Sequence, residues 1–341
     1  MKRSRNGIIS LAGALIIVLA LPALAMSADV IKLTHASLYG SDHVLSRADK
    51  LWIEKIEKET NGRVHITAYW GGALFPLADA IDEMVLGTAD IGVVSPVRAR
   101  MGFEITKAAP YFFLGANQQN GAHIAREWRA KFPELQKEYK GLKVVAWGGG
   151  LTYQLLSRVP IRKVEDLKGL RIGCMAAEAE VYRSLGADPQ IVGAGDFYVQ
   201  MQKSMLDVGC SPVQVMSAFK LYEVAKYVTL INFYNVPNGN RVMNINSYNK
   251  LPTDVRKVFD DNIEFWGNAE DSMLQNEDQA GAALAKKNGV EFITLPKAEL
   301  DKFYKPWRAH GLSKAKELDA KGLPGTKMLQ EAERLTQANS K

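Results

Sequence analysis

The chain has 341 residues, of which 47% are hydrophobic and 23% are charged, and its formal net charge is +6. This composition excludes an intrinsically disordered chain, and the length favours two folded units over a single core. The positive charge is mild and lies along helices that also carry acidic residues. Because no basic stripe with interleaved aromatic residues occurs, we expect no nucleic-acid partner.

The N-terminal segment is typical of a secretory signal peptide. Three basic residues precede the apolar stretch 8–21, and Ala23-Leu24-Ala25 has the small-x-small pattern of a cleavage site. We predict a signal peptide over residues 1–25, with a second candidate cut after residue 28. The alternative, an uncleaved membrane anchor, fits less well because the apolar run is short for a membrane span and lacks a basic flank after it. We therefore expect an exported, periplasmic protein.

The hydrophobic pattern then predicts a first α/β unit. Apolar residues alternate or cluster as in strands over four segments and repeat at helical spacing over two. The predicted strands are 30–36, 64–68, 91–94 and 142–147, and the predicted helices are 45–56 and 77–86. A triple glycine, Gly148-Gly149-Gly150, follows the last strand. It lacks the downstream Lys and Ser or Thr of a phosphate-binding loop, so we interpret it as the passage to a second unit.

The stretch from residue 164 to residue 212 repeats the order strand, helix, strand, helix, strand, which indicates a parallel sheet. Its predicted strands are 170–174, 190–192 and 206–210, and its predicted helices are 176–185 and 196–205. Ligands of such sheets bind beyond the carboxyl ends of the strands. In this stretch those ends are Gly173-Cys174 and Cys210-Ser211.

Beyond residue 212 the pattern becomes more helical. Strand-like runs over 228–234 and 241–246 flank a turn at Asn238-Gly239-Asn240. Pro252 suits the first turn of a long helix, and the remainder to about residue 335 is charged and helical in pattern. The buried stripe of the long helix is expected at Val255, Phe259, Ile263 and Trp266. We expect one lobe over 29–150 plus about 238–275, and a second over 151–237 plus about 276–335.

Several segments resemble those of the TRAP-type (DctP-like) solute-binding proteins, and the resemblance covers nearly all of the chain after the leader. These segments are DLKGLRI (166–172), SLGADP (184–189), DFYVQMQ (196–202) and LDVGCSP (206–212). The resemblance implies a two-lobed α/β periplasmic binding protein fold of the type II kind. It has two parallel or mixed sheets flanked by helices, and a long helix bridges the lobes. It also implies a receptor that closes on a small organic molecule and delivers it to membrane permease subunits.

The resemblance also locates a site. Members of the family usually hold the substrate carboxylate on an Arg of a K-I-R-V strand, and this chain has Gly173 at that position. The Glu and Asn of the family's D-G-x-E-N-P motif are replaced by Cys210 and Ser211, and a further basic position of the family is Tyr153. Because the opposite charges are lost together, neither is left buried and unpaired. We therefore expect a monocarboxylate or an aromatic or apolar ligand rather than a C4-dicarboxylate.

The predicted ligand-binding residues lie at strand ends in both lobes. They are Ser37, Ser95, Arg98, Tyr153, Gly173, Cys174, Cys210, Ser211 and Tyr234. Arg98 matches a basic position that sugar-acid binders of the family use and is the expected anion contact, with Arg100 as the alternative register. The other interpretation of Arg98 is a solvated surface residue. For Cys174 and Cys210 two readings stay open, a disulfide in an oxidising compartment or two small buried hydrophobic residues.

We expect no enzymatic activity, no metal and no cofactor. The five histidines form no H-E-x-x-H or similar zinc spacing, and no G-x-S-x-G nucleophile elbow occurs. Two alternatives come from other functional classes. One is a sensory solute-binding protein that signals to a receptor kinase, and the weaker one is an exported enzyme. We expect the receptor to be a monomer.

Overall fold

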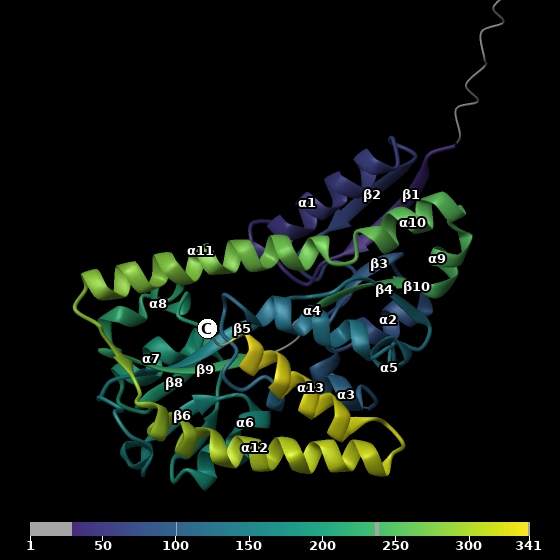
Figure 1. Ribbon diagram of the computed structural model, residues 1–341. Helices are drawn as coiled ribbons and strands as arrows, with labels where there is room; N and C mark the ends of the chain where they lie inside the picture. The colour runs from purple at the N-terminus through teal and green to yellow at the C-terminus, as the bar shows by residue number, and fades with distance from the viewer. Residues whose placement is uncertain (1–28, 100, 236–238, 340–341) are drawn as a thin grey trace, which may run out of the picture.

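The computed structural model describes residues 29–99, 101–235 and 239–339, although the side chains of residues 98, 234 and 235 are not among its described parts. The predicted signal peptide lies outside these residues. Figure 1 shows two α/β units joined by a long helix that runs along one side of both. Within the described residues no helix combines the length and the apolar composition of a membrane span.

The first unit is built on a five-stranded sheet, which we call sheet A. Its order is β2-β1-β3-β10-β4, with β1, β2 and β3 parallel and β10 antiparallel to both of its neighbours. The strands are β1 (Ile31–Ala36), β2 (Val64–Tyr69), β3 (Ile91–Val94), β4 (Leu142–Ala146) and β10 (Asn240–Asn244). All five overlap predicted strands. The predicted last strand ends early because the Asn244 side chain accepts hydrogen bonds from two backbone N–H groups and caps the next helix.

Helices cover both faces of sheet A. One face packs against α1, α10 and α11, where Trp52, Phe259 and Trp266 are fully buried. The other face packs against α2 and the segment that contains α3 to α5. These helices are α1 (Val44–Glu59), α2 (Ala80–Leu86), α3 (Glu104–Ala108), α4 (Gly121–Lys131), α5 (Glu134–Lys137), α9 (Ile245–Lys250), α10 (Thr253–Asp261) and α11 (Phe265–Lys287).

The second unit is built on a six-stranded sheet, sheet B, of order β11-β9-β5-β8-β6-β7. β6 is parallel to β7 and β8, β11 is parallel to β9, and β5 is antiparallel to β8 and β9. The strands are β5 (Leu151–Ser157), β6 (Arg171–Cys174), β7 (Asp188–Ile191), β8 (Val208–Ser211), β9 (Tyr227–Asn235) and β11 (Glu291–Thr294). One expectation was wrong here: residues 291–294 are a strand rather than part of a helical tail. They pair with β9 and form an edge strand of sheet B, and Ile293 is buried there.

Helices also cover both faces of sheet B. α7 and α8 cover one face, and α6 and α12 cover the other. The helices of this unit are α6 (Ala176–Ser184), α7 (Phe197–Gln202), α8 (Val215–Ala218), α12 (Lys297–Ala320) and α13 (Gly325–Ala338). Short 3-10 turns connect the elements at η1 (Pro96–Arg98), η2 (Ala109–Tyr111), η3 (Val164–Leu167), η4 (Ala194–Asp196) and η5 (Leu221–Glu223).

The long helix bridges both units, as the family resemblance implies. α10 and α11 are separated by a short turn over residues 262–264, and α11 packs against α1 in the first unit and α8 in the second (Figure 1). Two glycines allow the close approach. A Cβ on Gly267 would lie 2.6 Å from the carbonyl oxygen of Trp147, and a Cβ on Gly281 would lie 2.8 Å from that of Val213.

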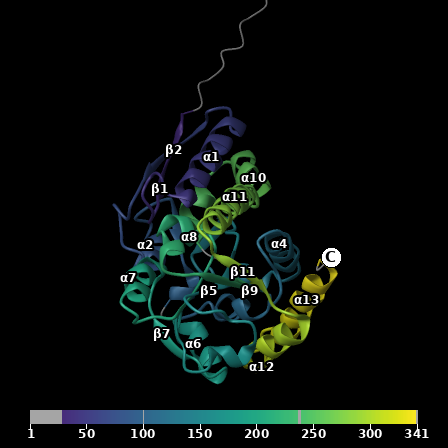
Figure 2. The ribbon, with the colours of Figure 1, turned by 90° about the vertical axis from the view of Figure 1, so that its left-hand side faces the viewer.

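The C-terminal helix connects the units a second time. Figure 2 shows α13 beside α4, a helix that precedes sheet B in the chain. The buried Trp128 on α4 donates its indole N–H to the carbonyl oxygen of Met328 on α13 at 2.8 Å. The end of the chain is therefore anchored on the segment that connects β3 to β4 of sheet A.

Candidate functional site

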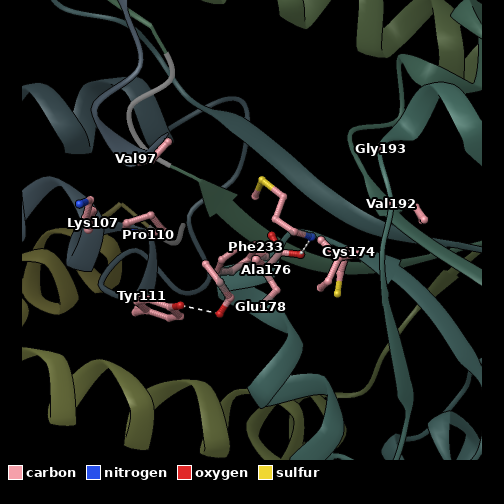
Figure 3. Close-up of a pocket in the computed structure, with 13 residues that line it drawn as sticks. Val97, Lys107, Pro110, Tyr111, Cys174, Ala176, Glu178, Val192, Gly193 and Phe233 are labelled. Carbon is pink, nitrogen blue, oxygen red and sulfur yellow. Dashed lines mark hydrogen bonds between the residues drawn. The ribbon is translucent and has the colours of Figure 1, made fainter. Parts of the chain in front are cut away.

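A cavity of about 590 Å³ lies where the two units meet. One side comes from the segment after β3, through Val97, Lys107, Pro110 and Tyr111. The other side comes from sheet B, at the carboxyl ends of β6 and β7 and on β9. These residues are Cys174, Met175, Ala176, Ala177, Glu178, Ile191, Val192, Gly193 and Phe233 (Figure 3). The cavity thus lies beyond strand ends, where ligands bind in sheets of this kind.

The cavity walls are mostly apolar, with a few polar groups among them. The phenol O–H of Tyr111 already donates to the carbonyl oxygen of Ala177 at 2.5 Å. The side chain of Lys107 makes no hydrogen bond or ion pair with another described residue. The remaining side chains that carry a proton or a charge are Cys174 and Glu178.

Glu178 is a buried acid in the first turn of α6. Only 1% of the residue is exposed. Its Oε2 accepts a hydrogen bond from the backbone N–H of Met175 at 3.4 Å, and its Oε1 has no partner with hydrogen-bond geometry among the described residues. Burial raises the pKa of this carboxyl to about 8. Glu178 is therefore largely protonated at neutral pH.

The two cysteines lie on neighbouring strands and are free thiols in the structure. Gly173 pairs with Gly209 in the parallel ladder, so Cys174 and Cys210 occupy the next position on each strand. Tyr182 donates its O–H to the sulfur of Cys210 at 3.0 Å. Burial raises the pKa of Cys174 to about 12 and that of Cys210 well above its ordinary value. Both thiols are therefore protonated and buried, which matches the second of the two readings of the sequence.

The structure brings one predicted site residue, Cys174, into the cavity wall. Two others lie at strand ends of sheet A: Ser37 follows β1, and Ser95 follows β3 with a buried Oγ that has no partner among the described residues. Three more lie on sheet B, with Tyr153 on β5, and Cys210 and Ser211 on β8. None of these five is among the described residues that line the cavity.

Gly173 lies beside Cys174 on β6, but it faces the other side of sheet B. A Cβ on Gly173 would lie 2.6 Å from Cε1 of Phe197 and 2.9 Å from Cδ2 of Leu206, on the α7 face, and 3.0 Å from Cγ2 of Val192, a residue that lines the cavity. For Arg98 and Tyr234 the backbone is described but the side chain is not, and Arg100 lies outside the described residues. Their chain neighbours Val97 and Phe233 do line the cavity.

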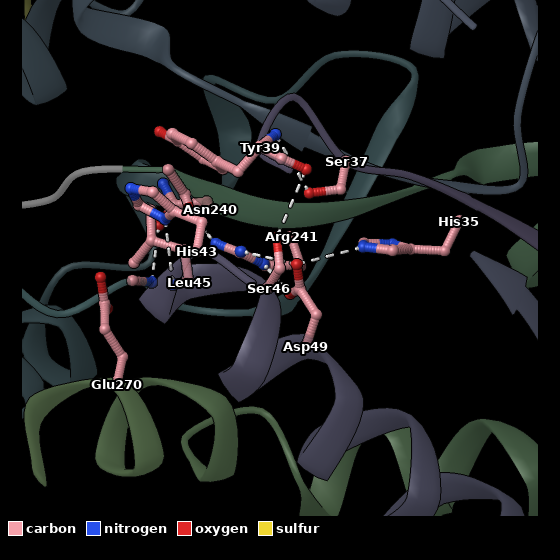
Figure 4. A network of polar contacts seen from close by, with 12 residues as sticks. His35, Ser37, Tyr39, His43, Leu45, Ser46, Asp49, Asn240, Arg241 and Glu270 are labelled. Carbon is pink, nitrogen blue, oxygen red and sulfur yellow. Dashed lines mark hydrogen bonds and ion pairs between the residues drawn. The ribbon is translucent and has the colours of Figure 1, made fainter. Parts of the chain in front are cut away.

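A second polar cluster holds sheet A together rather than lining the cavity (Figure 4). The fully buried Arg241 donates from Nε and Nη2 to the two carboxylate oxygens of Asp49, at 2.6 and 3.0 Å. Its guanidinium also stacks 3.4 Å from the ring centre of Trp266 on α11. Although burial opposes it, the charge of Arg241 beside it holds the pKa of Asp49 well below its ordinary range. This ion pair joins β10, α1 and the bridging helix.

Sequence reasoning missed three polar residues of the cavity: Lys107, Tyr111 and Glu178. Lys107 and Tyr111 lie in a segment without strong periodicity, and the sequence gives no signal that it returns to sheet B. Glu178 stands among alternating alanines and acids, a pattern that is usually solvated. Its position directly after a strand end was the one available signal.

Two α/β units, a bridging helix and a cavity at the strand ends between them define a two-lobed solute-binding protein. The chain belongs to the bacterial extracellular solute-binding protein family 7, the DctP family, whose model matches residues 35–310. Members of this family are periplasmic substrate-binding proteins of TRAP transporters rather than enzymes. They bind small organic ligands and work with membrane permease components.

Individual relatives agree with this assignment. The C4-dicarboxylate-binding periplasmic protein DctP of Rhodobacter capsulatus is 26% identical over 305 residues, which are 86% of this chain and 85% of that protein. A TRAP periplasmic solute-binding protein from Desulfovibrio salexigens has the same fold, with a TM-score of 0.81, 22% identity, and coverage of 91% of this chain and 96% of the other. A TRAP solute-binding protein from Rhodoferax ferrireducens, in complex with copurified benzoate, has a TM-score of 0.71, 19% identity, and coverage of 91% and 99%.

Proposed function

We propose that this protein is the receptor of a TRAP transporter for a small aromatic or apolar monocarboxylate. In this proposal the ligand binds in the cavity between the two units. The lobes close on it, and the closed receptor delivers it to the membrane permease.

The observation that carries the proposal is the composition of the cavity wall. Its volume of about 590 Å³ lies within the range of small-molecule sites, and Val97, Pro110, Ile191 and Phe233 offer it apolar surface. Lys107 is the one basic residue among the described residues that line it. A single cation matches a single carboxylate. A second carboxylate would be buried against apolar side chains without a partner, which is unfavourable.

Gly173 supports the same ligand class. The family's carboxylate-binding Arg has no counterpart at this position, where a Cβ alone would already lie 2.6 Å from Phe197 and 2.9 Å from Leu206. The benzoate-bound Rhodoferax protein is a fold relative that holds an aromatic monocarboxylate. The name of the Rhodobacter protein states a C4-dicarboxylate instead, so dicarboxylates are the natural comparison compounds.

The positions of the wall residues support the closure proposed here. Lys107 and Tyr111 come from the segment that connects β3 to β4 of sheet A, whereas Cys174 and Glu178 belong to sheet B and its helix α6. A ligand that contacts both sides favours the state in which they are close together, which shifts the population from open to closed.

Isothermal titration calorimetry tests the ligand class. The chain without residues 1–25 is refolded to remove bound ligand and titrated with benzoate, cyclohexanecarboxylate, benzamide and succinate. We expect both monocarboxylates to bind at least about tenfold more tightly than succinate, because the second carboxylate of succinate has no partner. Benzamide, which lacks the charge, is expected to bind weakly. Tighter binding of succinate than of either monocarboxylate would overturn the proposal.

A variant of Lys107 tests the role of the cation. Lys107→Met should weaken the binding of benzoate roughly 10- to 100-fold, because a hydrogen bond to a charged group contributes about 1.5–3 kcal/mol. Lys137→Met, at an exposed lysine on α5, is the matched control and should leave the affinity unchanged. Equal affinities of the two variants would show that Lys107 does not bind the carboxylate.

A further inference from the structure

We propose that Gln118 is a positioning residue for ligand binding, whose side-chain amide fixes the passage between the two sheets in the arrangement in which both lobes line the cavity. Gln118 is not among the described residues that line the cavity, so it acts without touching the ligand. This inference rests on the proposed function, since it names the residue that holds the two walls of the ligand site in place.

The passage consists of residues 147–150, between β4 and β5, where the chain leaves sheet A for sheet B. Side chains from other elements hold its backbone. The N–H of Gly148 donates to Oδ1 of Asn240 at 2.9 Å, and the N–H of Gly149 donates to Oε2 of Glu270 at 2.7 Å. A strand inside a sheet exchanges a row of backbone hydrogen bonds with its neighbours. The conformation of the passage depends instead on a few single side chains.

Gln118 holds two further backbone groups with one side chain. Its Nε2 donates to the carbonyl oxygen of Gly150 at 3.1 Å, and its Oε1 accepts from the N–H of Thr152 at 3.0 Å. Because a backbone carbonyl can only accept and a backbone N–H can only donate, these two partners define the orientation of the amide. Gln118 is only 8% exposed, and both hydrogen bonds join buried groups. Removing the amide would therefore leave two buried backbone groups without these partners.

The position of Gln118 connects it to both walls of the cavity. It belongs to the segment between β3 and β4, which provides Lys107 and Tyr111 to one wall. Thr152 lies on β5, the first strand of sheet B, and sheet B provides the other wall. The backbone carbonyl of Gln118 also accepts from Nε2 of Gln275 on α11 at 3.0 Å. One residue thus joins the wall segment, the start of sheet B and the bridging helix.

The passage has the freedom to rearrange when these bonds are lost. It contains Gly148-Gly149-Gly150, and glycine is the residue type with the widest choice of backbone conformations. None of these three glycines has a positive φ in the structure, so the observed conformation does not use the left-handed region that glycine enters most readily. We expect the loss of the Gln118 bonds to widen the range of lobe orientations. A ligand that binds one of these orientations then binds more weakly, in proportion to the fraction of the protein in it.

Gln118→Met tests the inference, because methionine has a similar length and can replace neither hydrogen bond. We expect the Kd of benzoate, measured by titration calorimetry, to rise by about 5- to 30-fold, as the loss of two ordinary hydrogen bonds predicts. Small-angle X-ray scattering of the ligand-free variant should show a larger radius of gyration than that of the ligand-free wild-type protein. Saturating benzoate should return the variant to the radius of gyration of the wild-type complex.

Matched variants separate positioning from stability. Gln119→Met changes the exposed neighbour of Gln118 and should keep the wild-type Kd and radius of gyration. Tyr248→Phe removes a hydrogen bond to Oδ2 of Asp260 at 2.7 Å within the first unit, so it should lower the melting temperature and leave both other quantities unchanged. Gln118→Glu keeps an acceptor for the N–H of Thr152 and should give values between those of the wild-type protein and Gln118→Met. It also provides the test if Gln118→Met does not fold. All comparisons are made well below the melting temperatures, which circular dichroism measures.

The outcomes distinguish this inference from the proposed function. If Gln118→Met keeps the wild-type Kd and radius of gyration, the inference is wrong and the receptor function stands. A change in only one of the two quantities also contradicts it, because lobe orientation and affinity would then not be coupled through Gln118. If no monocarboxylate binds to the wild-type protein, the proposed function fails. The radius of gyration of the ligand-free proteins then still decides whether Gln118 fixes the passage.

Discussion

Gly173 and Cys174 are consecutive residues of β6, and they face opposite sides of sheet B. Cys174 lines the cavity, whereas a side chain on Gly173 would enter the core beneath α7, against Phe197. Strand alternation makes this difference unavoidable, because neighbouring side chains point to opposite faces. An Arg placed at position 173 of this chain would therefore meet Phe197 before it could reach a ligand.

The tight packing at Gly173 leads to a prediction of stability. Gly173→Ala should lower the free energy of unfolding by about 1–3 kcal/mol, because the added methyl group overpacks a core in which Phe197 and Leu206 would lie within 3 Å of it. Urea denaturation followed by tryptophan fluorescence measures the change. Gly193→Ala is the control: it has a negative φ and no atom within 4 Å of its Cβ, so we expect a change within about 0.5 kcal/mol. Equal midpoints for both variants would contradict the packing described for β6.

The site residues show what the sequence can and cannot predict at this scale. Cys174 could be predicted because a buried strand ends there, and strand ends are where ligands bind. Lys107 could not, since its position in the cavity depends on how residues 96–116 pass from sheet A to the strands of sheet B. Ser37 and Ser95 also follow strand ends, yet they are not among the cavity's described lining residues. The sequence can predict where a strand ends. Which strand ends face the cavity depends on how the two lobes pack together.

At the scale of elements, α11 contacts the segment Gly148-Gly149-Gly150, where the chain passes from the first lobe to the second. The backbone N–H of Gly149 donates to Oε2 of Glu270 at 2.7 Å, and Asn240 on β10 accepts from the N–H of Gly148 at 2.9 Å. Asp271 lies against Gly149 so closely that a Cβ there would collide with its carboxylate. Two adjacent buried acids on one helix thus fix the conformation of the triple glycine.

These two acids should make the free energy of unfolding depend on pH. Burial and the neighbouring Asp271 raise the pKa of Glu270 to about 8, and burial raises that of Asp271 to about 7. The folded state therefore keeps protons that the unfolded chain releases once the pH exceeds the ordinary pKa of a carboxyl. The free energy of unfolding should fall as the pH rises from about 5 to 8, by up to about 1.4 kcal/mol per pH unit for each group, and level off above that window.

Glu270→Gln tests this dependence, because an amide at this position cannot ionise. The variant should show a shallower fall in unfolding free energy between pH 5.5 and pH 8, measured by urea denaturation at several pH values. Glu277→Gln, an acid on the same helix whose side chain is 38% exposed, should keep the wild-type slope and change the stability only slightly. A wild-type slope in Glu270→Gln would show that this carboxyl is ionised in the folded protein.

The sequence predicts elements well where a face is buried and periodic. Alternation in β1 and β2 and helical spacing in α1 were sufficient, because one side of each element packs on sheet A. The sequence does not indicate β11, because this strand is four residues long and mostly exposed, so that its pairing with β9 leaves little hydrophobic pattern. The long helix was predicted, but the turn over residues 262–264 that divides it was not.

At the scale of the whole molecule, both strand connections and helix contacts join the two units. Besides the crossover after β4 and the return before β10, α11 packs on both units and α13 returns to α4. A cluster of buried apolar residues runs from Ala36 on β1 to Phe233 on β9 and Trp307 on α12. The two units are therefore connected through α11 and α13 as well as through the strand connections.

Closure on the ligand should be visible in the size of the whole molecule and in its stability. Small-angle X-ray scattering of the refolded protein should show a smaller radius of gyration when benzoate saturates it, since a ligand in the proposed site would contact residues on both sides of the cavity. At about 100 times its Kd the ligand should add about 2.7 kcal/mol to the free energy of unfolding. Because the cavity walls come from both units, the melt should remain one transition that shifts as a whole. Lys107→Met at the same benzoate concentration should show a smaller change in both measurements. If the melt shifts while the radius of gyration stays constant, the ligand binds without closure, and the population shift proposed for this receptor is wrong.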